Sequence, residues 1–130
     1  MADESIPSQP AKPEYEKTPN FTSTYANNVF LESSTWDLKL IFGQLDQSTV
    51  PNTVKQHLAV TIPWAQAKLL LFYLQAHVKG EELQDGKIHI RPDTLPGEIS
   101  LPTGEQAKDP TFMQFYDFLK KLREEFIANA

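Results

Sequence analysis

The hydrophobic pattern changes period within residues 54–78, and this change predicts a strand that runs directly into a helix. Before Pro63 the residues alternate with the period of two that is typical of a half-buried strand, one face carrying Val54, Gln56, Leu58, Val60 and Ile62. Proline suits the first helical position, because the N–H that it lacks would have no partner within the helix there. From Trp64 onward the apolar residues recur every three or four positions, and Gly80 is the expected end of the helix.

This predicted helix is apolar on two sides. One side carries six residues that should cover the sheet: Trp64, Ala67, Leu70, Leu71, Leu74 and Val78. A second stripe runs along its back: Ala65, Leu69, Phe72, Tyr73 and Ala76. A helix that buries only one side has a single apolar stripe. The pattern therefore predicts that something also covers the back of the helix.

Two earlier segments, residues 25–33 and 36–42, also alternate and are separated by a few small polar residues. Such a pattern is typical of a β-hairpin. In the second segment four residues share one face: Trp36, Leu38, Leu40 and Phe42. Gly43 should end the alternation, and residues 46–53 should form a loop to the next strand. We expect a three-stranded antiparallel meander, with residues 87–91 as an optional fourth strand.

The last part of the chain predicts an amphipathic helix over residues 109–128, after a connector rich in proline and glycine over residues 92–108. Asp109 should cap this helix and Pro110 should occupy its first turn. Its apolar stripe comprises Phe112, Phe115, Tyr116, Leu119, Leu122 and Phe126. Three pairs have the spacing of helical ion pairs: Asp117 with Lys121, Lys120 with Glu124, and Lys121 with Glu125.

These elements predict the α+β class: an antiparallel meander packed against a central helix, with a C-terminal amphipathic helix. Residues 1–24 contain four prolines and no periodic apolar pattern, which predicts a disordered and dispensable tail. The remaining residues, 25–130, are long enough for a single domain with a core over 25–91.

Composition excludes several classes of function. The chain has no cysteine, so it can form no disulfide and has no thiol nucleophile. Its net charge of −5 argues against nucleic-acid binding, which needs clustered lysine and arginine. No apolar run approaches the roughly 20 residues that cross a bilayer. We expect no membrane partner, and the absence of a secretory signal predicts a cytoplasmic location.

Four segments occur in an order that resembles the bacterial domain of unknown function 3467 family: Tyr25-Ala26-Asn27, residues 36–44, residues 63–70 and Gly86-Lys87-Ile88. The resemblance covers about residues 25–90, without the tail or the last helix. One departure is Ile62, where the family pattern leads us to expect a serine cap. The family has no established activity, so the resemblance implies the fold and leaves the function open.

The side chains that could carry chemistry are not grouped in any recognised motif. His57 and His89 are expected on different strands and His77 on the helix, without the spacing of a metal site. The adjacent carboxylates Glu81-Glu82 and Glu124-Glu125 cannot face each other on a helix. We therefore expect no catalytic residue, no metal ion and no cofactor.

Three hypotheses for function follow. The first is a non-enzymatic protein-interaction or scaffold module that forms a homodimer or larger homo-oligomer. The second is a binder of extended apolar polypeptide, by analogy with the layout of the export chaperone SecB, and the third is an enzyme of unrecognised type. The expected interface comprises residues of both helices: Ala65, Leu69, Phe72, Tyr73, Ala76, Phe112, Phe115, Leu119, Leu122 and Phe126. The last helix could instead fold back onto the central helix of its own chain.

Overall fold

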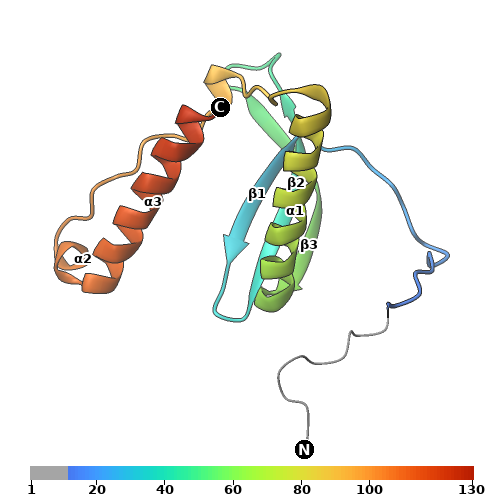
Figure 1. The fold of residues 1–130 in the computed structure, drawn as a ribbon, viewed down its shortest axis with the longest axis horizontal. Coiled ribbons are helices and arrows are strands. Elements are labelled where there is room, and N and C mark those ends of the chain that lie inside the picture. Colours follow the sequence, from blue (N-terminus) through green and yellow to red (C-terminus); the bar gives the residue numbers. More distant parts are fainter. Residues whose placement is uncertain (1–11) are drawn as a thin grey trace, which may run out of the picture. The chain divides into compact units, whose positions relative to one another are not determined.

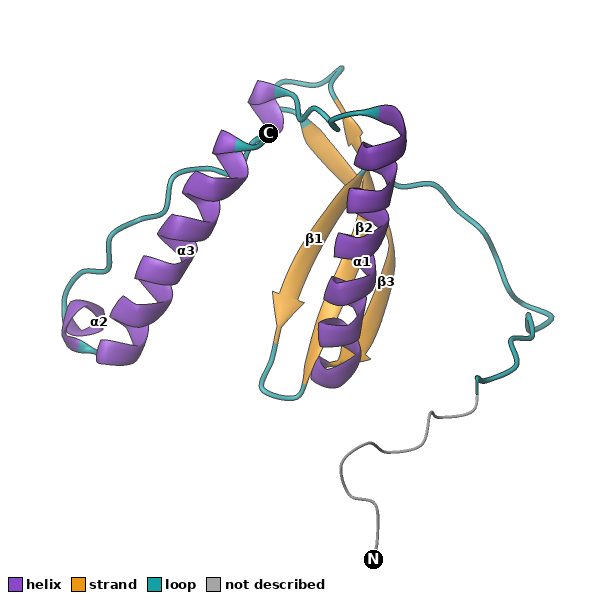
Figure 2. Cartoon of the chain, viewed as in Figure 1, coloured by secondary structure: helices purple, strands orange, loops and turns teal. Residues whose placement is uncertain are grey.

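The structure is a computed structural model that describes residues 12–130 (Figure 1). The chain divides within its first long helix into two compact units, one that ends at Ala67 and one that begins at Lys68. The elements in chain order, shown in Figure 2, are β1 (Asn28–Ser33), β2 (Asp37–Asp46), β3 (Thr53–Pro63), α1 (Trp64–Asp85), η1 (Pro92–Thr94), α2 (Glu105–Lys108) and α3 (Pro110–Ala128).

The three strands form the predicted antiparallel meander in the order β1-β2-β3. This confirms the α+β class and the three strands inferred from the alternating pattern. Opposite residues share a face, so Leu31, Leu40 and Val60 form one apolar row across the sheet. On the other face Phe30 lies opposite Ile41, with Glu32 opposite Lys39 as a pair of opposite charges.

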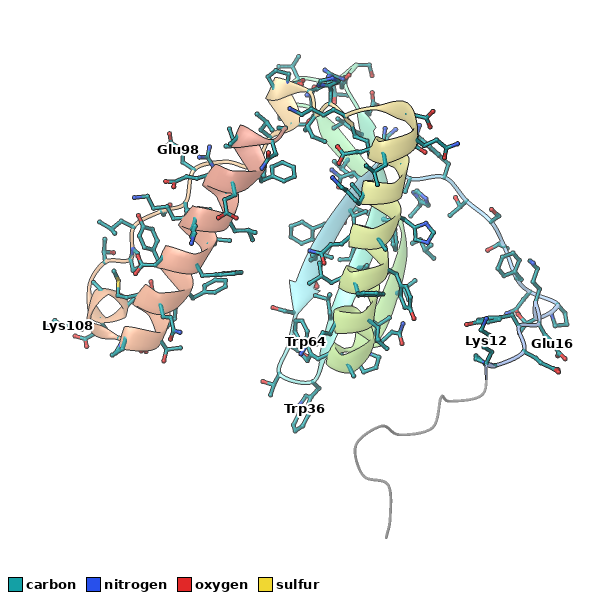
Figure 3. All side chains as sticks on the ribbon, viewed as in Figure 1. Lys12, Glu16, Trp36, Trp64, Glu98 and Lys108 are labelled. Atoms are coloured by element: carbon teal, nitrogen blue, oxygen red, sulfur yellow. The ribbon has the colours of Figure 1, made fainter. Side chains whose placement is uncertain are left out.

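A two-residue turn, Thr35-Trp36, joins β1 to β2. The Ser34 N–H donates to the Asp37 carbonyl at 2.9 Å. The Ser34 hydroxyl accepts from the N–H groups of Trp36 and Asp37, both at 3.1 Å. The prediction that Trp36 shares the apolar face of the sheet is wrong: it lies in the turn, its side chain is 82% exposed, and it points away from the strands (Figure 3).

The regular alternation is interrupted at Gly43, as the sequence pattern predicted, and β2 continues beyond it to Asp46, where the predicted loop begins. Gly43 marks a β-bulge: Phe42 pairs with Leu58 and Gly43 with Gln56, so His57 has no partner on β2. The Asn27 side chain compensates for the local irregularity by accepting from the N–H of Leu45 at 2.8 Å. The alternation breaks here because the ladder shifts register, and the pairing then resumes.

The junction of β3 and α1 is as abrupt as the change of period predicts. Pro63 is the last residue of β3 rather than the first of the helix, and α1 begins at Trp64, one position later than expected. The Trp64 Nε1–H donates to the Ser34 carbonyl at 3.0 Å and thereby fixes the first turn of α1 to the β1–β2 hairpin. The prediction that the rest of α1 covers the apolar face of the sheet stays a prediction.

The expected end of α1 at Gly80 is wrong. A glycine inside a helix costs only about 1 kcal/mol relative to alanine, and α1 passes through Gly80 to Asp85. The stop is Gly86, whose φ of 92° is left-handed and whose N–H donates to the Glu82 carbonyl at 2.9 Å.

The optional fourth strand over residues 87–91 is absent: these residues have no regular secondary structure. The Ile88 N–H donates to the Glu82 carboxylate at 3.0 Å, a local bond in place of a ladder bond. Part of the predicted tail, residues 12–24, likewise contains no helix or strand and is exposed. Residues 1–11 of that tail lie outside the described residues.

The C-terminal helix begins as predicted. The Asp109 carboxylate accepts from the N–H of Thr111 at 2.9 Å, and Pro110 occupies the first helical position. The connector contacts α3 through Arg123, whose Nε–H donates to the carbonyls of Gly97 at 2.7 Å and Pro96 at 3.1 Å. None of the three predicted ion pairs on α3 is within 4.0 Å, because exposed side chains gain little from such pairs and lose entropy by forming them.

Candidate interaction surfaces

The apolar back of α1 predicted from sequence is exposed in the structure. All five residues of this stripe lie at the surface: Ala65, Leu69, Phe72, Tyr73 and Ala76. Phe72 is 63% exposed, and its ring meets that of Tyr73 edge to face, with the centroids 5.3 Å apart. We refer to these five residues as the α1 stripe.

A second exposed surface, the α3 stripe, consists of Phe112, Phe115, Phe118, Leu119, Leu122 and Phe126. Leu119 is half-buried and the other five are exposed. The Phe115 and Phe118 rings are stacked, with their centroids 6.4 Å apart. Phe118 was missed from the sequence, although it follows Phe115 by three positions and precedes Leu122 by four, which is the spacing of a helical stripe.

Tyr116 was placed on the apolar stripe from its spacing, but it lies on the flank that the connector covers. There it lines a hollow of about 240 Å³ together with Glu98, Ile99, Lys120, Arg123 and Glu124. Four of these six residues are charged. The connector therefore covers one flank of α3 and leaves the phenylalanine residues exposed.

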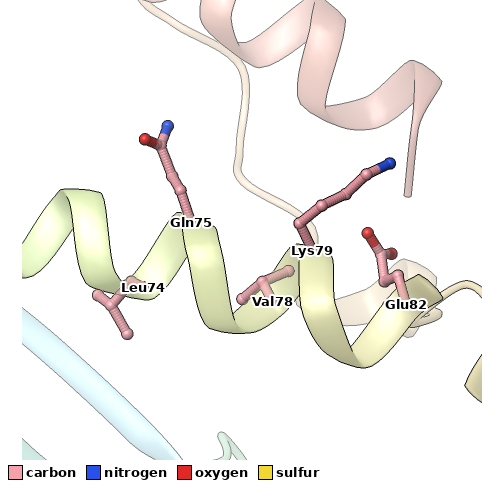
Figure 4. A pocket seen from close by; sticks show the side chains of 5 residues that line it. All are labelled: Leu74, Gln75, Val78, Lys79 and Glu82. Carbon is pink, nitrogen blue, oxygen red and sulfur yellow. The ribbon is translucent and has the colours of Figure 1, made fainter. Parts of the chain in front are cut away.

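A shallow hollow of about 320 Å³ lies along α1 (Figure 4), lined by Leu74, Gln75, Val78, Lys79 and Glu82. All five side chains come from the same helix, so they cannot surround a ligand. Ligand pockets are clefts that bury most of the surface of the molecule they bind. Neither hollow contains a group of converging titratable side chains of the kind that a catalytic site needs.

The structure does not bring the three histidines together as a site. His57 lies at the bulge of β3, where its Nε2 is 3.4 Å from the Thr24 hydroxyl, whereas His77 lies on α1 and His89 in an irregular segment. Within residues 12–130, no three histidine, aspartate or glutamate side chains are close enough together to hold a metal ion.

Two carboxyl groups have perturbed pKa values, and both are exposed. The hydroxyl and the N–H of Ser48 donate to Asp46 and lower its pKa. The pKa of Glu81 is raised, chiefly because its carboxyl group hydrogen-bonds to that of Asp85 one turn later. The i, i+4 spacing of Glu81 and Asp85 is the signal by which this pair could have been found from the sequence, where only Glu81-Glu82 was considered. Exposed carboxyl pairs without a cleft do not define a catalytic site.

The fold and surfaces describe a small α+β protein with a three-stranded sheet and exposed apolar helices. The family described as "Protein of unknown function (DUF3467)" matches residues 1–90, and the chain belongs to this family. The match ends where the sequence resemblance ended, but it also includes the N-terminal segment, which the sequence analysis had placed outside. Neither the curated proteins nor the solved structures include a match to the chain.

Across residues 12–130, no helix combines sufficient length with sufficient apolar character to span a membrane.

Proposed function

We propose that this protein is a non-enzymatic protein-interaction module that self-associates through the apolar surfaces of its helices. The strongest support is the exposure of its large apolar side chains, none of which is buried within residues 12–130. Burying a large apolar side chain is worth about 1.5–3 kcal/mol, so an extended exposed apolar surface favours association. Monomeric soluble proteins rarely expose large contiguous patches of this kind.

A second copy of the chain is the proposed partner. The family match ends at residue 90, before α3, so the family core includes the α1 stripe without the helix that could cover it. A homo-oligomer would cover this stripe with a surface that lies within the residues of the family match. Closed symmetric homo-oligomers are also the commonest assemblies of soluble proteins.

The experiment measures the mass of the full chain by light scattering from low to high micromolar concentration. We expect a particle at least twice the 14.8 kDa of one chain. Phe72→Glu, which places a charge on the α1 stripe, should shift the protein towards the monomer. Gln75→Glu is the matched control, because it adds the same charge to the polar side of the same helix. A well-folded full-length monomer at high micromolar concentration would contradict the proposal.

A further inference from the structure

The outer edge of β1 carries a second kind of interaction surface, made of backbone rather than side chains. We propose that β1 pairs antiparallel with β1 of a second copy and continues the sheet across a two-fold axis. This inference rests on the proposed self-association through the helices and adds to it a strand contact with a defined register. Edge strands present unpaired N–H and C=O groups that readily accept another strand.

The hydrogen bond of the hairpin shows which backbone groups of β1 face this edge. The Ser34 N–H donates to Asp37 on β2, and backbone groups alternate in direction along a strand. Asn28, Phe30 and Glu32 therefore direct their backbone groups towards β2. The N–H and C=O groups of Val29, Leu31 and Ser33 face outward, and the order of strands places no partner beyond them in the described sheet.

Two-fold symmetry and this alternation together restrict the register. Residues whose backbone groups face outward must pair with residues of the second copy whose backbone groups also face outward. In an antiparallel pair related by a two-fold axis, this is possible only when the axis passes through one residue position, so that this residue lies opposite the same residue of the second copy. When that residue is Phe30, Val29 lies opposite Leu31 of the second copy and Asn28 opposite Glu32. Apolar side chains then meet apolar ones, and polar side chains meet polar ones, at every position from 28 to 32.

The neighbouring registers lose this match. Centring the pair on Leu31 places Phe30 opposite Glu32 of the second copy, and centring it on Val29 places Phe30 opposite Asn28. Val29, Phe30 and Leu31 are 52%, 53% and 55% exposed, so a second strand would cover apolar surface on both faces of the sheet. The sequence of β1 is therefore complementary to itself in one register.

The other edge of the sheet, formed by β3, carries features that protect edges from pairing. It has Lys55 near one end, Pro63 at the other, and the bulge at His57 between them. The strand β1 contains no lysine, proline or bulge within Asn28–Ser33. The contrast assigns the pairing to β1 rather than to β3.

Disulfide cross-linking tests the register directly, because the natural chain has no cysteine. In the proposed pair Phe30 faces its own copy at a non-hydrogen-bonded position, where the Cα atoms are about 4.5 Å apart, within the disulfide range of about 4.4–6.8 Å. Phe30→Cys should therefore form a linked dimer under mild oxidation. Glu32→Cys is the control: its two copies lie about 14 Å apart along the strands, so we expect at least roughly tenfold less linked dimer.

Proline at an outward position tests the pairing itself. Leu31→Pro removes an N–H that faces the edge and keeps the bonds between β1 and β2, so it should weaken self-association. Thr61→Pro is the matched variant on β3. Leu38 directs its backbone groups towards β3 and pairs with Ile62, so the backbone groups of Ile62 face β2. Because the direction alternates along a strand, the N–H of the neighbouring Thr61 faces the outer edge. We expect Thr61→Pro to associate like the natural chain. Circular dichroism of both variants checks whether each retains the fold.

The outcomes separate the two proposals. Efficient cross-linking of Phe30→Cys, together with its absence in Glu32→Cys, supports the β1 register even if Leu31→Pro proves unable to fold. A natural chain that associates while Phe30→Cys gives no more linked dimer than Glu32→Cys overturns the edge pairing and leaves self-association standing. A natural chain that stays monomeric overturns both.

Discussion

At the residue scale, Gly43 has the tightest environment among the glycines. A Cβ atom added there would lie 2.7 Å from Val54 Cγ1 and 2.9 Å from the Lys55 carbonyl oxygen. The backbone of β3 cannot move away without breaking the ladder at the bulge. Gly43 is also the one buried residue within residues 12–130. Glycine is therefore required here by close approach of two strands rather than by an unusual φ.

We predict that Gly43→Ala lowers the free energy of unfolding by about 1–3 kcal/mol, the cost of forcing extra atoms into a packed site. The control is Gly80→Ala, where an added Cβ meets nothing within 4 Å in the interior of α1. That change should stabilise by about 0.5–1 kcal/mol, since alanine is the better helix former. Chemical denaturation of both variants measures the difference, and equal stability of Gly43→Ala and the natural chain would contradict the prediction.

Single residues were also where the sequence was hardest to interpret. Trp36 continues the apolar alternation of β2 by position, yet the two-residue turn takes it out of the strand. Turn length depends on the hydrogen bonds of Ser34, which alternation does not reveal. Gly43 was correctly recognised as an interruption, but a bulge and a strand end produce the same break in the pattern.

At the element scale, Asp109 determines where α3 begins. Its carboxylate satisfies one of the N–H groups that a helix leaves unpaired at its start, and its charge lies at the positive end of the helix dipole. The preceding helical segment, α2, ends at Lys108, so Asp109 also separates the two helices.

We predict that Asp109→Ala destabilises the protein by about 1 kcal/mol, the typical cost of losing an N-cap. Asp109→Asn should retain most of the stability, because the amide oxygen can still accept from Thr111. Asp117→Ala, in the middle of the same helix and without an ion pair, serves as the control for loss of charge. Thermal melting of the three variants gives the comparison, and an Asp109→Ala variant as stable as the Asp117→Ala variant would refute the role of the cap.

Strong local signals allowed the elements to be predicted from the sequence. The change of period at Pro63 and the Asp109-Pro110 pair each located a boundary to within one residue. The end of α1 was wrongly predicted at Gly80 because a helix can tolerate an internal glycine. The helix ends instead at Gly86, whose backbone is left-handed. Most residues of the α1 and α3 stripes could be predicted from their helical spacing. The surroundings of Tyr116 could not, because they depend on the path of the connector, which a helical projection does not show.

At the scale of the whole molecule, the described residues have exposed apolar helices and no buried apolar side chain. Folding of a domain normally depends on such burial to offset the conformational entropy that the chain loses. If self-association supplies the missing burial, as proposed above, the folded state and the assembled state are linked. Stability then depends on protein concentration, because association stabilises the folded chain by mass action.

We predict that the melting temperature of the natural chain rises with concentration, by roughly 3 °C for each tenfold increase, as expected for a folded dimer of this size. Circular dichroism over a hundredfold range of concentration measures the slope. Phe72→Glu, which should favour the monomer, ought to melt at a lower temperature with a flatter slope, while Gln75→Glu should follow the natural chain. A melting temperature that is constant across the range would show that one chain buries enough apolar surface by itself, and the link between folding and assembly would then be wrong.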